Sequence, residues 1–333
     1  ESPGWEPCIV PFTEVVHDRL NVEVLRGCAR GCRFCQAGMM YRPVRERSAD
    51  NVVASTLAGL AATGYDEVSL TSLSSTDHSQ IADILTRLNH ACDGKGVRIS
   101  VPSQRLDAFG VDMAGLVAGQ KKGGLTFAPE AGTQRLRDVI NKGVTEEDLV
   151  RSVTDAFEQG WSAVKLYFMI GLPGETQEDI EAIVDLCRKA RDAAGRGMPR
   201  LQVTAAISPF VPKSHTPFQW EPQITQEQVR ERCQYLRDAF RAEKCLKLRW
   251  HEPEMSFLEG VLSRADRRIA DVVEKAYRKG AIFASWMDHF SIDPWLESLA
   301  ECGLTAEEFT GARELDAPLP WDHLNAGVSR EFL

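Results

Sequence analysis

The chain contains one short stretch that decides its fold: Gly27-Cys28-Ala29-Arg30-Gly31-Cys32-Arg33-Phe34-Cys35-Gln36-Ala37-Gly38. Three thiolates spaced by three and then two residues can wrap one cuboidal iron-sulfur cluster. The glycines let the backbone turn tightly and approach the sulfides. We therefore predict that Cys28, Cys32 and Cys35 hold a four-iron, four-sulfur (4Fe-4S) cluster. Three ligands leave one iron open, and a small molecule that carries an amine and a carboxylate can chelate it.

A zinc site is the competing interpretation of these cysteines. Structural zinc usually takes four closed ligands, commonly as two pairs separated by a longer loop. The sequence has no second pair, although Cys8 or His17 could supply a fourth ligand. Nine cysteines in 333 residues are too few and too irregularly spread for a disulfide scaffold. We expect the remaining six to be isolated, small apolar residues: Cys8, Cys92, Cys187, Cys233, Cys245 and Cys302.

Outside this stretch, β-rich runs alternate with amphipathic runs, which is typical of a parallel sheet. We predict six strands, at Asn21–Arg26, Glu67–Thr71, Arg98–Pro102, Gly124–Ala128, Ala163–Ile170 and Gln202–Ser208. Apolar residues that return every three or four positions predict helices at Ala49–Thr63, Asp77–Ala91, Thr145–Gln159 and Thr176–Ala193. An α/β barrel, partial or complete, is the expected architecture. Its reacting groups should lie at the carboxyl ends of the strands.

Three regions are expected along the chain. Residues 1–20 form an N-terminal lead-in, residues 21–245 form the barrel, and residues 246–333 form a helical C-terminal appendage. The alternation stops near residue 245, and Met255–Ser263 and Ala265–Lys279 have the pattern of helices. No internal repeat of fixed period is present, which argues against solenoids and propellers.

The composition is that of an ordinary globular protein, with 43% hydrophobic and 26% charged residues. No apolar run approaches the roughly 20 residues that span a bilayer. The amino terminus has neither an initiating Met nor a basic and apolar signal stretch, so we expect a trimmed, cytoplasmic chain without a membrane partner. The formal net charge of −9 means that nucleic acid would need a local basic patch.

The Cys-x3-Cys-x-aromatic-Cys pattern, with Phe34 before the third cysteine, resembles the hallmark of the radical S-adenosylmethionine (SAM) superfamily. The resemblance implies a partial (βα)6 TIM-like barrel. It also implies that the open iron binds SAM. An electron from a donor such as flavodoxin or ferredoxin then splits SAM into methionine and a 5'-deoxyadenosyl radical, which abstracts a hydrogen atom.

The same resemblance suggests where the chain contacts SAM. The loop after the second strand would hold the amino group, the fourth strand the ribose, and the turn after the fifth strand the adenine. Lys165 would pair with the carboxylate, unless it belongs to an ordinary structural ion pair, and Glu130 has the alternative role of a helix-start carboxylate. The sixth strand leads into an aromatic segment that closes over adenine or substrate, or packs in the core through Phe218 and Trp220. The implied cofactor-binding set is Phe34, Ser72, Ser74, Glu130, Lys165, Gly171, Pro173, Ser208 and Phe210.

Within the superfamily the chain is most similar to uncharacterised cobalamin-associated radical SAM proteins, through Val16–Arg19, Arg42–Ser48 and Trp321–Leu324. That group implies methyl transfer that uses cobalamin. Its members carry a cobalamin-binding-like domain that these 333 residues do not contain, so we expect cobalamin only together with that domain.

Two alternatives remain open. The chain more distantly resembles tRNA methylthiotransferases, which implies RNA as a possible substrate. Arg42, Arg45 and Arg47 would then position a phosphate or the SAM carboxylate, or else form a solvated face or internal ion pairs. A methylthiotransferase needs a second cluster with its own three cysteines, and no second motif is visible. The other alternative is a non-catalytic iron-sulfur electron carrier, although such carriers usually close the cluster with a fourth cysteine.

Overall fold

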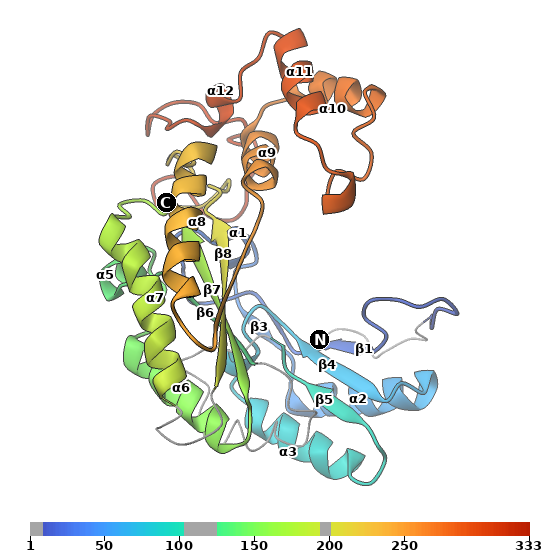
Figure 1. Ribbon diagram of the computed structural model, residues 1–333. Coiled ribbons are helices and arrows are strands. Elements are labelled where there is room, and N and C mark those ends of the chain that lie inside the picture. The colour runs from blue at the N-terminus through green and yellow to red at the C-terminus, as the bar shows by residue number, and fades with distance from the viewer. Residues whose placement is uncertain (1–8, 103–124, 194–200) are drawn as a thin grey trace.

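A computed structural model describes residues 9–102, 125–193 and 201–333. Its amino-terminal half contains a three-stranded parallel sheet of order β1-β4-β5, built from Leu20–Glu23, Glu67–Thr71 and Arg98–Ser100. Helices α2 (Ala49–Thr63) and α3 (Ile81–Cys92) pack against this sheet (Figure 1). Their apolar faces bury Val22, Val68 and Leu70 in a first core.

A single residue ends the first strand and redirects the chain. The Val24 N–H donates to the Thr71 carbonyl at 3.0 Å, whereas the Val24 carbonyl accepts from the Arg47 N–H at 3.0 Å. The chain then continues as β2 (Leu25–Arg26), which pairs antiparallel with β3 (Arg45–Glu46). The cysteine loop follows β2 directly and leads into the short helix α1 (Gln36–Met40).

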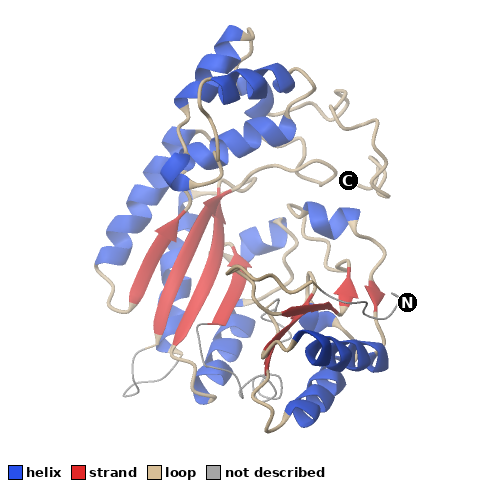
Figure 2. Cartoon of the chain, turned by 90° about the vertical axis from the view of Figure 1, so that its right-hand side faces the viewer, coloured by secondary structure: helices blue, strands red, loops and turns tan. Residues whose placement is uncertain are grey.

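The second half contains a four-stranded parallel sheet of order β6-β7-β8-β9. Figure 2 shows its four strands side by side, set apart from the smaller sheet. Three helices lie along one side of the sheet (Figure 1), and their apolar residues form the larger core with Leu166, Phe168 and Ile207. The strands are Leu125–Glu130, Ala163–Ile170, Gln202–Pro209 and Leu246–Trp250, and the helices are α6 (Glu146–Glu158), α7 (Gln177–Asp192) and α8 (Gln226–Arg241).

Parallel strands that alternate with helices confirm the predicted α/β class and suit a partial barrel. The second and fifth predicted strands match the observed bounds of β4 and β7. The first is divided at Val24, and the third ends at Ser100, two residues before Pro102. The fourth prediction began at Gly124, which lies outside the described residues, as does the chain between Ser103 and that glycine.

The largest difference from the sequence prediction is β9, which lies inside the range assigned to the helical appendage. Residues Leu246 to Trp250 of β9 pair in parallel with Val203 to Ile207 of β8, so the sheet continues five residues beyond position 245. The segment reads Leu-Lys-Leu-Arg-Trp, a period-2 alternation that the basic residues disguise as a polar run. The division into three regions itself stays a prediction.

Beyond β9 the chain is helical. Helices α9, α10, α11 and α12 share a separate small core that includes Leu258, Val272, Trp295 and Phe309. Their bounds are Pro253–Arg264, Ile269–Arg278, Asp293–Glu301 and Glu307–Thr310. The first two agree with the predicted helices to within a few residues. Within the described residues, no helix is both long and apolar enough to cross a membrane.

Candidate functional site

The cysteine loop adopts a left-handed backbone, which favours glycine, at two places. Gly27 has φ = +93° and Gly31 has φ = +71°. A Cβ on Gly27 would lie 2.4 Å from the Tyr41 carbonyl oxygen, so this position has no room for a side chain. The loop therefore folds back tightly onto the segment after α1, as the sequence predicts for a cluster-binding loop.

The donor set of the loop fits an iron-sulfur cluster. Cys28, Cys32 and Cys35 form no disulfide bond, and Cys32 is buried while the other two are partly exposed. The Cys35 sulfur also accepts from the Gly38 N–H at 3.4 Å, which caps α1. Among the described residues no group of three His, Cys, Asp or Glu side chains is placed to hold a single metal ion. A cubane differs from that case, because each thiolate binds a separate iron.

The loop is fastened to the second half of the molecule by hydrogen bonds. The Arg33 N–H donates to the Ile140 carbonyl at 2.9 Å, and the Asn141 side-chain amide donates to the Gly31 carbonyl at 2.9 Å. Gln36 Nε2 donates to Ser214 Oγ at 2.6 Å in the loop after β8. The cysteines thus sit between the segments that follow β6 and β8.

The aromatic residue of the motif joins an apolar cluster at the carboxyl ends of the second sheet. Phe34 packs there with Leu172 and the buried Phe210. Phe210 and Phe218 meet edge to face with centroids 5.8 Å apart, so Phe218 has the core-packing role that the sequence left open. Ser208 lies two residues before Phe210 and is paired in register with Met169. The structure therefore brings together the predicted Phe34 and Phe210.

Glu130 is the last residue of β6 and adopts φ = +69°, beyond an irregularity in the pairing with β7. Its carboxylate accepts from Lys142 Nζ at 2.9 Å, and the same ammonium lies 5.9 Å from the Phe34 ring centroid. The helix-start role belongs instead to Thr133, whose hydroxyl accepts from the Leu136 N–H. Sequence reasoning missed Lys142, since nothing local connects it to a residue twelve positions earlier.

The turn after β7 is held from inside by Glu175. Both oxygens of this carboxylate accept from the Gly171 N–H at 2.9 Å, and Gly171 has φ = +84°. Burial raises the pKa of Glu175, although Arg232 at 2.6 Å acts in the opposite direction. The Gly171 N–H thus already has a hydrogen-bond acceptor. Contact of Gly171 and Pro173 with the adenine of SAM stays a prediction, and it would use other atoms of the turn.

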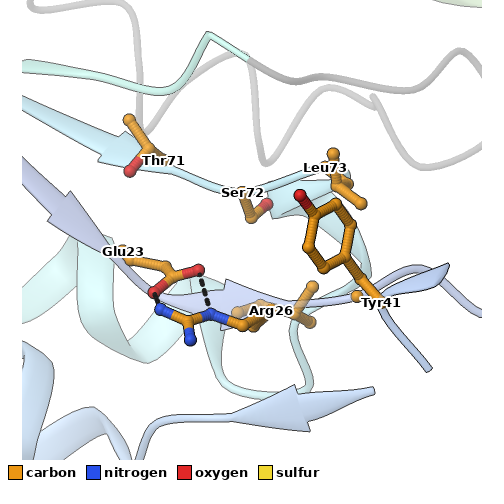
Figure 3. Close-up of a pocket in the computed structure, with 8 residues that line it drawn as sticks. Glu23, Arg26, Tyr41, Thr71, Ser72 and Leu73 are labelled. Carbon is orange, nitrogen blue, oxygen red and sulfur yellow. Dashed lines mark hydrogen bonds and ion pairs between the residues drawn. The ribbon is translucent and has the colours of Figure 1, made fainter. Parts of the chain in front are cut away.

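Ser72 lines a cavity of about 420 Å³ at the carboxyl ends of β1 and β4 (Figure 3). Glu23 and Arg26 face each other there, with the Arg26 Nη2 to Glu23 Oε2 distance at 2.6 Å, and the hydrogen bond from Arg26 lowers the pKa of Glu23. Tyr41 lies on the other side of the cavity near Ser72 and Leu73 (Figure 3). Sequence reasoning missed Glu23, Arg26 and Tyr41 because they are far apart in the chain or outside the motif.

Ser74 lines a neighbouring cavity of about 420 Å³ together with Cys28. It is buried, and its hydroxyl donates to Asp77 Oδ2 at 2.7 Å. Arg30, from the cysteine loop, donates to the same Asp77 carboxylate through Nε at 2.9 Å. The loop after β4 is therefore tied to the cysteine loop through Asp77.

Lys165 lies near the start of β7, where Nζ donates to the Tyr167 hydroxyl at 2.9 Å. Six residues of extended strand, about 20 Å, separate it from Gly171 at the carboxyl end. An ion pair between Lys165 and the SAM carboxylate stays a prediction. Lys165 lies far along the strand from the turn at Gly171. Of the arginines after the cluster motif, Arg47 donates internally to Asn51 and Ser55, and Arg42 donates to the Gly38 carbonyl at 2.9 Å.

The family model described as the Radical SAM superfamily matches residues 22–187. An uncharacterized protein from Methanocaldococcus jannaschii is 29% identical over 283 residues, which cover 85% of this chain and 60% of that protein. A tRNA-2-methylthio-N(6)-dimethylallyladenosine synthase from Desulforamulus reducens is 24% identical over 51% of this chain and 39% of its own. An uncharacterized methyltransferase from Pyrococcus horikoshii is 27% identical, over 49% and 35% respectively.

Solved structures of the same kind are also similar. The radical S-adenosylmethionine methyltransferase TsrM from Kitasatospora setae, with cobalamin and a 4Fe-4S cluster bound, matches with a TM-score of 0.49 and 22% identity. The match covers 61% of this chain and 38% of TsrM. This chain thus spans between about a third and three fifths of the length of the relatives named here.

Proposed function

Because this chain belongs to the radical SAM superfamily, we propose that it holds a 4Fe-4S cluster on Cys28, Cys32 and Cys35 and cleaves SAM reductively. The bound, reduced cluster would supply the electron that releases a 5'-deoxyadenosyl radical for hydrogen abstraction from a substrate. The observation that carries the proposal is the loop of three cysteines without disulfide bonds, fastened between the carboxyl ends of the strands. An external flavodoxin or ferredoxin would supply the electron.

The surrounding residues would bind and orient SAM. Glu130 is an acceptor-only carboxylate, suited to ribose hydroxyls, and Lys142 holds it in place from 2.9 Å. Ser72 and Ser74 would accept from the SAM amino group with their backbone and hydroxyl oxygens. Phe34 and Phe210 belong to an apolar cluster that would exclude water from one side of the site.

We infer methyl transfer as the outcome in the full-length protein, with cobalamin supplied by a domain outside these residues. Its support is the similarity to an uncharacterized methyltransferase and to the cobalamin-bound TsrM methyltransferase. In this interpretation the chain supplies the SAM-cleaving half of the reaction. Added methylcobalamin, or the full-length protein, should then couple SAM cleavage to a methylated product.

The first test is anaerobic reconstitution with iron and sulfide, reduction with dithionite, addition of SAM, and chromatography for 5'-deoxyadenosine. The wild-type chain should release it, and Cys32→Ala should lose both the cluster absorbance and the product. Cys302→Ala removes a thiol at the end of α11 and should leave both unchanged. A fully assembled cluster that never cleaves SAM would support the electron-carrier interpretation instead.

The second candidate is methylthio transfer to RNA, favoured by the similarity to tRNA-2-methylthio-N(6)-dimethylallyladenosine synthases. It predicts a second cluster in the full-length protein, which iron counting would detect there as about eight rather than four irons. Four irons in the full-length protein together with SAM cleavage would remove this candidate.

A further inference from the structure

A buried hydrogen bond joins the C-terminal segment to the loop after β8. Trp321, in the stretch that resembles the cobalamin-associated proteins, packs with Trp220 and Leu319 in a small apolar cluster. Its indole Nε1 donates to the side-chain oxygen of Gln219 at 2.7 Å. The C-terminal segment is therefore attached to this loop by a directional contact as well as by packing.

Gln219 also binds within the loop itself. Its side-chain oxygen accepts from the His215 N–H at 3.0 Å, and the residue is only 3% exposed. Both partners of this oxygen are donors, so only the oxygen of the amide can face them. Removal of the amide would leave two buried donors without an acceptor, which destabilises a folded protein more than the loss of an exposed hydrogen bond.

The backbone of His215 needs this acceptor because its conformation is strained. The residue adopts φ = +56°, in the left-handed region that residues other than glycine rarely occupy. Such a conformation persists only where the surrounding structure holds it in place. The hydrogen bond from the His215 N–H to Gln219 therefore helps to fix the path of the loop, and with it the position of the preceding residue, Ser214.

Ser214 in turn binds the cysteine loop. Gln36, the residue after Cys35, donates from Nε2 to Ser214 Oγ at 2.6 Å and to the Ser214 carbonyl at 3.1 Å. Figure 1 shows α1, which begins at Gln36, beside the carboxyl end of β8. A path of hydrogen bonds and adjacent residues thus runs from Trp321 through Gln219 and Ser214 to the third cysteine of the motif.

The other side of the cysteine loop is held by a different segment. The Asn141 side chain, which follows β6 and α5, donates to the carbonyl of Gly31, between Cys28 and Cys32. The two sides of the loop are therefore fastened separately, one to the chain after β6 and one to the chain after β8. Residues that surround metal ligands orient those ligands. Loosening the β8 side alone should accordingly shift Cys35 relative to the other two cysteines.

We propose that Gln219 is a positioning residue for the iron-sulfur cluster. Acting through Ser214 and Gln36, it fixes where the Cys35 thiolate meets its iron. The inference rests on the proposed function, in which Cys35 is a cluster ligand. It also gives the C-terminal segment a part in the site, because Trp321 donates to the same oxygen of Gln219.

The test follows the loss of cluster absorbance from the anaerobically reconstituted chain after an iron chelator is added. Gln219→Leu should lose the cluster at least about tenfold faster than the wild type, as expected when two hydrogen bonds are removed. Gln219→Glu keeps oxygen acceptors toward both donors and should hold the cluster nearly as well as the wild type. The matched control is Gln223→Leu, since Gln223 is 8% exposed and donates to the Ser256 carbonyl of α9 at 2.7 Å. This control should lose the cluster at the wild-type rate.

A double-mutant cycle separates positioning from a general loosening of the fold. Gln36→Leu breaks the same path at its other end, next to the cysteine. Because Gln219 acts through Gln36, the double variant Gln36→Leu/Gln219→Leu should lose the cluster no faster than Gln36→Leu alone. Where urea unfolding shows that Gln219→Leu folds poorly, Gln219→Asn takes its place in the cycle, since it draws the same amide back from both donors.

Equal rates of cluster loss in Gln219→Leu and Gln223→Leu would overturn the inference, and so would effects of Gln36→Leu and Gln219→Leu that simply add. Release of 5'-deoxyadenosine from SAM is measured in parallel on the wild type. Cluster loss that depends on Gln219 supports the positioning role whether or not SAM is cleaved. A wild-type chain that takes up no cluster would overturn both this inference and the proposed function.

Discussion

The two sheets both carry candidate site residues at their carboxyl ends, but they hold them in place differently. After β4, the loop is held by hydrogen bonds, from Ser72 to Ser75 and from Ser74 and Arg30 to Asp77. After β7 and β8, the site residues are set in an apolar cluster around Leu172 and Phe210. Hydrogen bonds each add little net free energy, whereas a buried aromatic adds several kcal/mol. The amino-terminal half of the site should therefore be the more easily rearranged.

Gly27→Ala is expected to have the largest effect on the amino-terminal half of the site, because it changes the path of the backbone rather than the packing of a side chain. The new Cβ would lie 2.4 Å from the Tyr41 carbonyl oxygen. The loop cannot close, so iron loading and SAM cleavage should be lost. Gly64→Ala is the matched control, with φ = +72° but no neighbour within 4 Å, and should cost only about 1 kcal/mol with loading intact. Normal iron content in Gly27→Ala would refute the claim that this position has no room for a side chain.

Phe210→Ala tests the apolar support of the second half. The side chain is 1% exposed and meets Phe218 edge to face, so its removal should lower the free energy of unfolding by about 3–5 kcal/mol. Urea unfolding followed by circular dichroism measures the loss. Phe283→Ala, at an exposed position, should change it by less than about 0.5 kcal/mol. A small loss of unfolding free energy in Phe210→Ala would contradict the claim that apolar packing holds the second half of the site in place.

Asp179 is a polar exception in the second half, since it joins the loop after β6 to α7 by accepting from Thr133, Thr176 and Arg135. Burial alone would raise the pKa of Asp179, but these donors hold it below its usual range. The unfolded chain therefore binds the proton more tightly, and the stabilisation is present above about pH 4 and lost as the pH falls further.

Asp179→Asn should accordingly unfold about 2 kcal/mol more easily at pH 7. Its stability curve should then converge with that of the wild type below pH 4, as followed by urea unfolding across a pH series. Asp185→Asn, at an exposed position of the same helix, serves as the control. Parallel stability curves for Asp179→Asn and wild type would contradict the claim that the ionised Asp179 carboxylate stabilises the fold.

Ser74→Ala should have the smallest effect on stability. It removes one hydroxyl that donates to Asp77, while Arg30 keeps its own hydrogen bonds to the same carboxylate, so we expect a loss of about 1 kcal/mol. Its effect on SAM binding should exceed its effect on stability, and isothermal titration of the reconstituted chain would measure it. Unchanged SAM affinity would leave Ser74 with a structural role alone.

The sequence predicted those parts of the molecule that depend on local patterns. The strands Glu67–Thr71 and Ala163–Ile170 were correct because their apolar residues define them, and the cysteine motif indicated the family. The strand at Leu246–Trp250 was missed because its lysine and arginine hid an alternating pattern. That alternation was the available signal.

The contacts across the site could not be predicted in the same way. Lys142 reaches Glu130 only because α5 (Gln134–Val139) turns the chain back, and Glu23 and Tyr41 line the same cavity only through the path of the cysteine loop. Such pairs have no fixed spacing in the sequence. The backbone roles of Gly171 and Gly27 became clear only with their φ angles and neighbours.

Val24 has a consequence for how this region can change in length. Its N–H is bonded into one sheet and its carbonyl to the segment beside another, four residues before Cys28. A one-residue insertion or deletion between Val22 and Leu25 would turn the side chains of β2 to the opposite face of its pairing with β3. The spacing from the first strand to the first cysteine is thus fixed from both sides, by Thr71 in one sheet and by Arg47 beside the other.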